Sequence, residues 1–238
     1  MKSGNKSTRD SSKKLTHDIV ACKSCPRLRQ HCQEVARLKR RSFKNEKYWG
    51  LPVPNFGNTK CQLLVVGLAP AAHGGNRTGR MFTGDRSGQW LYRALYRARF
   101  ANQATYETAN DGLKLKNCAI TAIAHCAPPD NNPNADEIAN CSAFLERTIA
   151  LGGPSVLLAL GGVAWRRVIE TYRARGLWTG RLQPFAHGSE LVFTDGTVLL
   201  GSYHPSQQNT FTKRLTEPMF DAIFTRARHL LKRESQHT

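Results

Sequence analysis

The chain has 238 residues, of which 40% are hydrophobic, and this composition is typical of a globular protein and excludes a disordered one. Its 35 Lys and Arg outnumber 17 Asp and Glu, so the formal net charge is +18, which favours a polyanionic partner such as nucleic acid. No apolar run approaches the roughly 20 residues of a membrane span. We therefore expect no membrane partner and a cytoplasmic protein, associated with the nucleoid if the source is bacterial.

The order of polar and apolar residues predicts the layout of the chain. Residues 1–16 are polar and basic and predict a flexible tail, followed by a single domain over residues 17–238. Pro26 and the apolar residues that follow it at helical spacing predict the first helix, which ends near Leu38. The later elements are predicted in chain order as a strand (62–66), a helix (87–99), a strand (118–124), a helix (135–152, capped by Asn134), a strand (156–160), a helix (163–175), a strand (197–202) and a helix (216–233).

This alternation of strands and helices predicts an α/β fold. A mostly parallel central sheet, covered by helices on both faces, gives three α/β/α layers. Ligands of such sheets bind at the carboxyl ends of the strands. Four segments begin there and should share one rim, namely 67–85, 125–134, Gly161 with Gly162, and 202–210.

The first of these segments has the glycine spacing of a phosphate-binding loop at residues 74–81. Arg80 stands where such loops have lysine, and Met81 stands where they have the hydroxyl that binds magnesium. A nucleotide-dependent enzyme therefore remains only as an alternative. The segment still offers backbone amides and the guanidinium groups of Arg77 and Arg80, which suit a phosphodiester or a polar ring.

The cysteine pattern indicates a metal centre. Cys22 and Cys25 have the two-residue separation of paired metal ligands, and Cys126 with Cys141 completes a set of four. Four thiolates suit zinc and an iron–sulfur cluster equally well. Cys32 is an alternative ligand. Otherwise the remaining three cysteines are expected to be small buried residues: Cys32, Cys61 and Cys118.

A histidine at the end of the last predicted strand is a candidate functional residue. A lone histidine is more often structural, but His204 lies at the predicted ligand rim beside a run of polar residues, and we therefore place it in the site.

The chain resembles family 5 (type B) of the uracil-DNA glycosylase superfamily over roughly residues 18–232, in four blocks in the right order. They are CKSCPRL, GLAPAAHGGNRTGRMFTGDRSG, HCAPPDNNP with the following Cys141, and HPSQQNTFTKRL. The resemblance implies an α/β/α glycosylase fold and a 4Fe-4S cluster held by Cys22, Cys25, Cys126 and Cys141. It also implies excision of deaminated bases from DNA, namely uracil and, in this family, hypoxanthine and xanthine, as the first step of base-excision repair. Such an enzyme is expected to work as a monomer.

The resemblance also implies roles for site residues. Phe82 would stack on the extruded base, and His204 matches the histidine of the last motif. No side chain at positions 69, 71 or 72 supplies a base, so Asp85, the nearest carboxylate, is expected to take that role; the alternative is that it only caps the following helix. The start of the first motif would line the pocket: Gly67, Leu68, Ala69, Pro70 and Ala71.

Two parts of the sequence keep alternatives open. Family members resembling ITNAVKC carry an asparagine that reads the base edge, whereas this chain has Ala122 there, which leaves a catalytically weak binder of damaged DNA as the alternative function. Gln207, Gln208 and Asn209 either fill the gap left by the extruded base or form an ordinary polar turn.

Overall fold

The computed structural model describes residues 10–234. Its centre is one six-stranded sheet with the strand order β1-β3-β2-β4-β6-β5. The four inner strands are parallel, and the two edge strands pair antiparallel to their neighbours. The strands are β1 (Phe56–Gly57), β2 (Leu63–Gly67), β3 (Cys118–Ala122), β4 (Val156–Leu160), β5 (Glu190–Val192) and β6 (Val198–Ser202).

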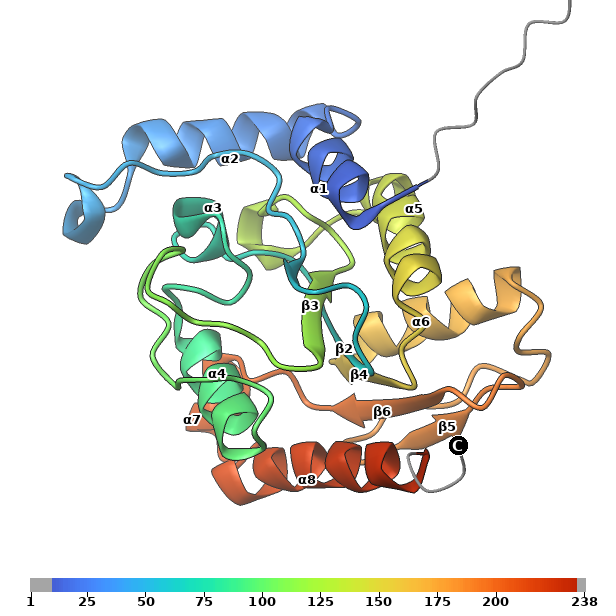
Figure 1. Cartoon of the computed structure of the whole chain (residues 1–238). Coiled ribbons are helices and arrows are strands. Elements are labelled where there is room, and N and C mark those ends of the chain that lie inside the picture. The colour runs from blue at the N-terminus through green and yellow to red at the C-terminus, as the bar shows by residue number, and fades with distance from the viewer. Residues whose placement is uncertain (1–9, 235–238) are drawn as a thin grey trace, which may run out of the picture.

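Helices cover both faces of this sheet (Figure 1). One face packs against α4 (Arg86–Arg97) and α8 (Glu217–Glu234), and the other packs against α5 (Ala135–Gly152) and α6 (Gly162–Ala174). The predicted three-layer α/β/α fold with a mostly parallel sheet is therefore confirmed.

Strand β2 shows how the sequence produces these layers. All five of its residues are buried, because both faces of the sheet are covered. Leu63 and Val65 belong to the apolar cluster under α4 and α8, whereas Leu64 and Val66 belong to the cluster under α5 and α6. Successive side chains of a strand point to opposite faces, so a continuous apolar run can supply two separate cores.

The order of the strands places a ligand crevice beside β2. The chain passes from β2 to β3 on one side and then returns to β4 on the other side of β2. A reversal of this kind opens a crevice at the carboxyl ends of the two strands. The loop after β2 and Gly161, which follows β4, lie at this point, as the sequence predicts.

The N-terminal part differs from the expected flexible tail. Helix α1 (Ser12–Ala21) buries two apolar side chains and contacts α5. The Arg147 guanidinium on α5 lies 2.8 Å from both Asp10 and Asp18. The ordered structure therefore begins before residue 17, and residues 1–9 of the expected tail lie outside the described residues.

The remaining predicted helices and strands are confirmed with small shifts of their ends, including α2 (Pro26–Leu38). The sequence reasoning missed two short helices, α3 (Gly75–Thr78) and α7 (Gln207–Phe211), and both edge strands. Within residues 10–234, no helix is both long and apolar enough to cross a membrane. Two 3₁₀ turns complete the secondary structure: Arg41–Phe43 and Pro129–Asn131.

Candidate functional site

Two aromatic rings from distant parts of the chain meet at the rim of the sheet. Phe82 lies between β2 and α4, and His204 follows β6; their ring centroids are 6.0 Å apart, with 29° between the planes. The Phe82 ring also packs on Gly67, where a Cβ atom would lie only 2.9 Å from Cζ. The segments after the first and last predicted strands therefore share one rim, as expected.

The backbone holds Phe82 in an unusual conformation. Its φ of 54° lies in the left-handed region, which residues with a bulky side chain rarely adopt. Gly88 leaves no room for a Cβ atom, because the carbonyl oxygen of Phe82 occupies that space. The hydroxyl of Tyr92 donates a hydrogen bond of 2.5 Å to the neighbouring Met81 carbonyl. These contacts fix the direction in which the Phe82 ring points.

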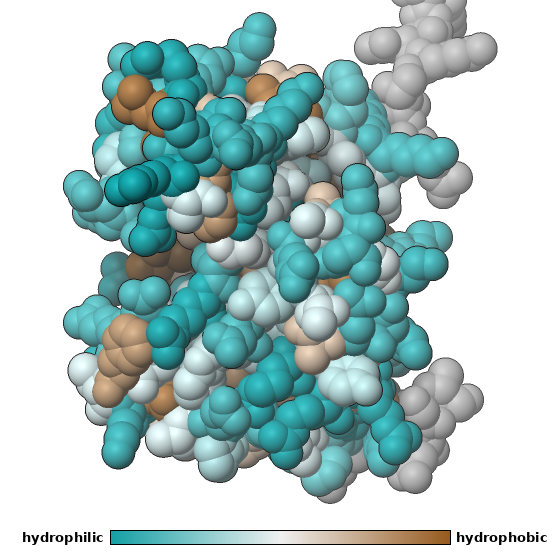
Figure 2. All heavy atoms as spheres, turned by 90° about the vertical axis from the view of Figure 1, so that its left-hand side faces the viewer, coloured by the Kyte–Doolittle hydropathy of each residue, from teal (hydrophilic) through white to brown (hydrophobic). Residues whose placement is uncertain are grey.

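The space between the two rings is closed in this structure. A base stacked between them needs about 3.5 Å on each side, or about 7 Å in total, which exceeds the observed 6.0 Å. A base bound here would therefore stack on one ring rather than between both. Figure 2 shows the side of the molecule that carries α3, α4 and α7, where hydrophobic patches interrupt a largely hydrophilic surface. Five cavities of the described residues lie elsewhere on the surface.

Burial controls the charge of His204. It lowers the pKa of the imidazole to about 4, so the ring is neutral at pH 7. The side-chain Nδ2 of Asn209 donates a hydrogen bond of 2.8 Å to the backbone carbonyl of His204, which stabilises the turn into α7. A neutral imidazole can donate one N–H hydrogen bond to an oxygen atom.

Asp85 lies at the start of α4 and contacts the loop after β2. Its carboxylate accepts a 3.0 Å hydrogen bond from the Gly88 amide and caps the helix, so the capping interpretation is confirmed. The other carboxylate oxygen faces Gly74, where a Cβ atom would lie 2.5 Å from it. Burial raises the pKa of Asp85. Capping and a catalytic role are compatible, and the catalytic role stays a prediction.

The loop after β2 presents free backbone donors. Among the hydrogen bonds of residues 10–234, none uses the amide of Ala69, Ala71 or Ala72 as its donor. The carbonyl of Ala71 instead accepts bonds from the amides of Gly74 and Asn76, both 3.1 Å long, which fold the loop back on itself. These N–H groups are unpaired among the described residues, and their role as donors to a ligand stays a prediction.

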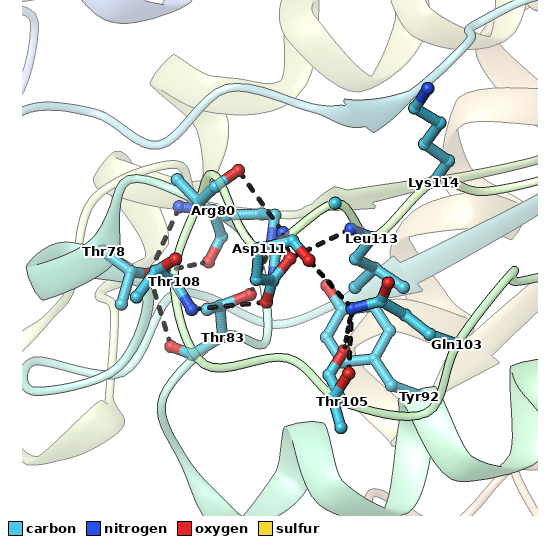
Figure 3. Close-up of polar contacts among 12 residues, drawn as sticks. Thr78, Arg80, Thr83, Tyr92, Gln103, Thr105, Thr108, Asp111, Leu113 and Lys114 are labelled. Atoms are coloured by element: carbon cyan, nitrogen blue, oxygen red, sulfur yellow. Dashed lines mark hydrogen bonds and ion pairs between the residues drawn. The ribbon is translucent and has the colours of Figure 1, made fainter.

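The two arginines of this segment do not face a ligand, which corrects the sequence interpretation. Arg80 is only 4% exposed, and its guanidinium makes a bidentate pair with Asp111 at 2.8 and 2.7 Å (Figure 3). Its Nε donates a third bond, of 2.7 Å, to Thr83. Arg77 is also buried and pairs with Glu46. Both cations connect parts of the fold, and neither is available to a phosphodiester.

The four cysteines predicted as ligands line one small cavity between α2 and the segment after β3. Cys25, Cys126 and Cys141 are buried, and burial raises the pKa of the Cys141 thiol to about 12. No three His, Cys, Asp or Glu side chains of the described residues are grouped closely enough to hold one metal ion. In a four-iron cluster each thiolate binds a separate iron, so the donors stand farther apart than ligands of a single ion.

Two further polar atoms at this cavity fit a charged group. Arg29 Nη1 and His125 Nε2 are buried with no hydrogen-bond partner among the described residues, and both residues border the cavity. Unpartnered buried polar atoms are costly and are typical of sites that receive a ligand. Cys32 is buried and does not line this cavity, but its thiol contacts the Ala127 carbonyl at 3.5 Å and also the Cys126 thiol, so its role as a small buried residue stays a prediction.

A family model for the uracil DNA glycosylase superfamily matches residues 54–228. The chain belongs to this superfamily. It is 49% identical over 218 residues to a type-5 uracil-DNA glycosylase of Mycobacterium leprae, which covers 91% of this chain and 94% of that relative. The type-5 uracil-DNA glycosylase of Pyrobaculum aerophilum is 41% identical and covers 88% of each chain. That of Thermus thermophilus is 40% identical over 89% of this chain and 94% of the relative.

Ala122, which stands where the resemblance predicts asparagine, lies beside the candidate site. Ala122 is the last residue of β3 and pairs with Gly67 across the parallel ladder. It is 2% exposed, and it belongs with Phe82 to the apolar cluster under α4 and α8. Because its side chain is a methyl group, Ala122 offers no hydrogen-bonding atom at this point of the rim.

Arg29 and His125 line the cysteine cavity, and sequence reasoning did not single them out. His125 precedes Cys126 directly, and this adjacency to a predicted ligand is the one signal that the sequence offered. Arg29 lies one helical turn after Cys25 and therefore on the same face of α2. Nothing in the pattern distinguishes it from the other basic residues of that helix.

Proposed function

We propose that this chain is a monofunctional DNA glycosylase that hydrolyses the N-glycosidic bond of uracil, and also of hypoxanthine and xanthine, in DNA. The observation that carries the proposal is the meeting of Phe82 and His204 beside the free amides of the loop after β2. Together these groups supply a flat surface for a base and donors for its oxygen atoms. The net charge of +18 suits a DNA substrate.

Stabilisation of the departing base is the main chemical demand on the site. Cleavage leaves negative charge on the base and positive charge on the sugar, as in other glycoside hydrolyses. The amides of Ala69 and Ala71 and the N–H of neutral His204 would donate hydrogen bonds to the base anion. The loss of one such donor typically slows a reaction about a hundredfold to a thousandfold.

Asp85 would act on the sugar side of the bond. Its raised pKa makes the carboxylate a better proton acceptor, so it can take a proton from the attacking water. Its negative charge also stabilises the positive charge that develops on the sugar. The hydrogen bond from the Gly88 amide holds the carboxylate in place for both roles.

Ala122 would widen the range of bases accepted. An amide at this position would bind one base edge and reject others by about 1 to 3 kcal/mol. A methyl group makes no such distinction. The same observation favours a second candidate function, a catalytically weak protein that binds damaged DNA and does not release the base.

We also propose that the cysteine cavity holds a 4Fe-4S cluster. Cys22, Cys25, Cys126 and Cys141 would be the ligands, and the Arg29 guanidinium would offset the negative charge of the four thiolates. Such a cluster supplies a cross-link between distant segments, and base hydrolysis requires no electron transfer from it. Iron and acid-labile sulfide in stoichiometric amounts are expected in anaerobically purified protein, and a preparation that holds zinc alone contradicts the assignment.

An excision assay tests the activity. DNA duplexes that contain uracil, hypoxanthine or xanthine are incubated with the protein, which we expect to be a monomer. They are then treated with alkali, which breaks the strand at abasic sites. We expect breakage with wild type and at least a hundredfold less with His204→Ala. Tight, salt-sensitive binding to the same duplexes without breakage supports the second candidate instead.

A further inference from the structure

A long loop between α4 and β3 lies against the segment that follows β2. It covers residues 98–117 and bridges to itself at Ala101 and Leu115, so its middle part projects as a tip. The carboxylate of Asp111, in this tip, makes the bidentate pair with the Arg80 guanidinium (Figure 3). The tip of the loop is therefore fixed beside the candidate site.

A tyrosine in the same tip packs on the start of α4. The ring of Tyr106 stacks with that of Tyr92, and their centroids are 5.6 Å apart with 29° between the planes. The ring also lies against Gly88, where a Cβ atom would be 3.0 Å from Cδ2 of Tyr106. Tyr106 is half-buried, and its hydroxyl takes part in no hydrogen bond of residues 10–234. Its contacts with α4 are therefore made by the ring.

Gly88 is the residue through which this packing reaches the candidate catalytic groups. Its amide donates the 3.0 Å hydrogen bond that holds the Asp85 carboxylate. The carbonyl oxygen of Phe82 occupies the place of its missing side chain, 1.8 Å from where a Cβ atom would lie. Glycine has more backbone freedom than any other residue, and Gly88 lies in the first turn of α4, where helices fray. Its position must therefore be fixed by the residues packed against it.

We propose that Tyr106 is a positioning residue of the glycosylase reaction, and that its ring acts by holding Gly88 in place. The inference rests on the proposed glycosylase function. Gly88 in turn fixes the Asp85 carboxylate and the Phe82 backbone. Without the ring, water reaches the Gly88 amide and competes with the carboxylate for its hydrogen bond. The ring acts through packing, so a phenylalanine at position 106 should serve equally well.

Single-turnover excision of uracil from a duplex separates this role from substrate binding. At saturating protein, Tyr106→Ala should excise about 10- to 100-fold more slowly than wild type, because a misplacement of about 1 Å typically costs about a hundredfold. Its affinity for a duplex with a non-hydrolysable uridine analogue should stay within about twofold of wild type, because the ring acts on Gly88 and not on DNA. Tyr106→Phe should restore the excision rate. Tyr96→Ala is the matched control, because Tyr96 is a half-exposed tyrosine of α4 about two helical turns beyond Gly88.

Hydrogen exchange of the Gly88 amide tests the same contact without any reaction. Measured by NMR on protein with labelled glycine, this amide should exchange at least about tenfold faster in Tyr106→Ala than in wild type, and at the wild-type rate in Tyr106→Phe. The Gly153 amide is the internal control. It donates a 2.9 Å hydrogen bond to the Ile149 carbonyl at the end of α5, so its unchanged exchange shows that the rest of the fold is intact.

Three results would overturn or separate the claims. An unchanged Gly88 exchange rate in Tyr106→Ala overturns the inference, and so does an excision rate within threefold of wild type. A loss of excision in Tyr106→Phe as large as in Tyr106→Ala assigns the role to the hydroxyl and overturns it as well. Failure of wild type to excise uracil rejects the proposed function, and the exchange rates still decide whether Tyr106 holds Gly88.

Discussion

Gly67→Ala tests whether the position of the Phe82 ring determines activity. The added Cβ atom would lie 2.9 Å from Cζ and 3.0 Å from Cε2 of that ring. Carbon atoms in contact are usually about 3.5 to 4.0 Å apart, so the ring must move by about 0.5 to 1 Å. Its own backbone cannot follow, because the Phe82 carbonyl is packed against Gly88.

We expect the substitution to reduce catalysis more than stability. A misplacement of about 1 Å typically costs about a hundredfold in rate, so the single-turnover excision rate of uracil should fall about 10- to 100-fold. Overpacking costs about 1 to 3 kcal/mol, which lowers the Tm by about 2 to 12 °C for a chain of this size. Both values are measured on the same preparation, so a folding defect is separated from a defect of the site.

Gly162→Ala is the matched control. Gly162 begins α6 at the same rim, and a Cβ atom there would meet Phe185 at 3.4 Å, which is an ordinary contact. The rate of this variant should remain within twofold of wild type. A Gly67→Ala protein that excises uracil within threefold of wild type would show that the ring position does not control the reaction.

Three further predictions follow from the charges in and around the site. Because desolvation lowers the pKa of His204 to about 4, its ring signals in an NMR pH titration should stay unchanged from about pH 8 to 5.5 and shift only as the pH approaches 4; a transition centred near 6.5 contradicts a desolvated, neutral imidazole. Asp85→Asn keeps an acceptor for the Gly88 amide, so the Tm should change by no more than about 2 °C while the excision rate falls at least tenfold; an unchanged rate limits Asp85 to capping. Asp111→Ala leaves the buried Arg80 guanidinium unpaired, which lowers the free energy of unfolding by about 3 to 5 kcal/mol. Calorimetry should therefore show a Tm about 6 to 20 °C lower than that of wild type, and a smaller drop means that water replaces the carboxylate.

The sequence predicted the layers of the fold because its inner strands are continuous apolar runs and its helices have clear ends. Asn134 and Glu137 form a capping box at the start of α5, as the sequence indicates. The edge strands β1 and β5 were missed because they have two and three residues and mixed burial. Helix α1 was missed because its first residues are polar and basic, and its place in the fold depends on contacts with distant segments, chiefly α5.

The site was predictable where its chemistry depends on residue type. It was less predictable where it depends on which side chains, distant in sequence, contact one another. The CxxC spacing marked the cysteines, and they do line one cavity. The arginines of the glycine-rich segment were misinterpreted because local spacing cannot show that Arg80 meets a carboxylate 31 residues away. The same limit applies to Arg29, whose importance follows only from an unpartnered nitrogen at the cysteine cavity.

The buried arginines explain how a loop without catalytic side chains can still suit the reaction. Hydrogen-bond donors stabilise a departing anion best when they are already in position, because no free energy is then spent on arranging them. Arg80 joins the loop after β2 to Asp111, and Arg77 joins it to Glu46. The Nε atom of Arg77 also donates a 2.8 Å hydrogen bond to the His73 carbonyl within the loop. Each pair holds a different part of the loop against the rest of the fold. In the proposed reaction, the cations would therefore act on the base through the backbone amides that they keep in place, and not through direct contact.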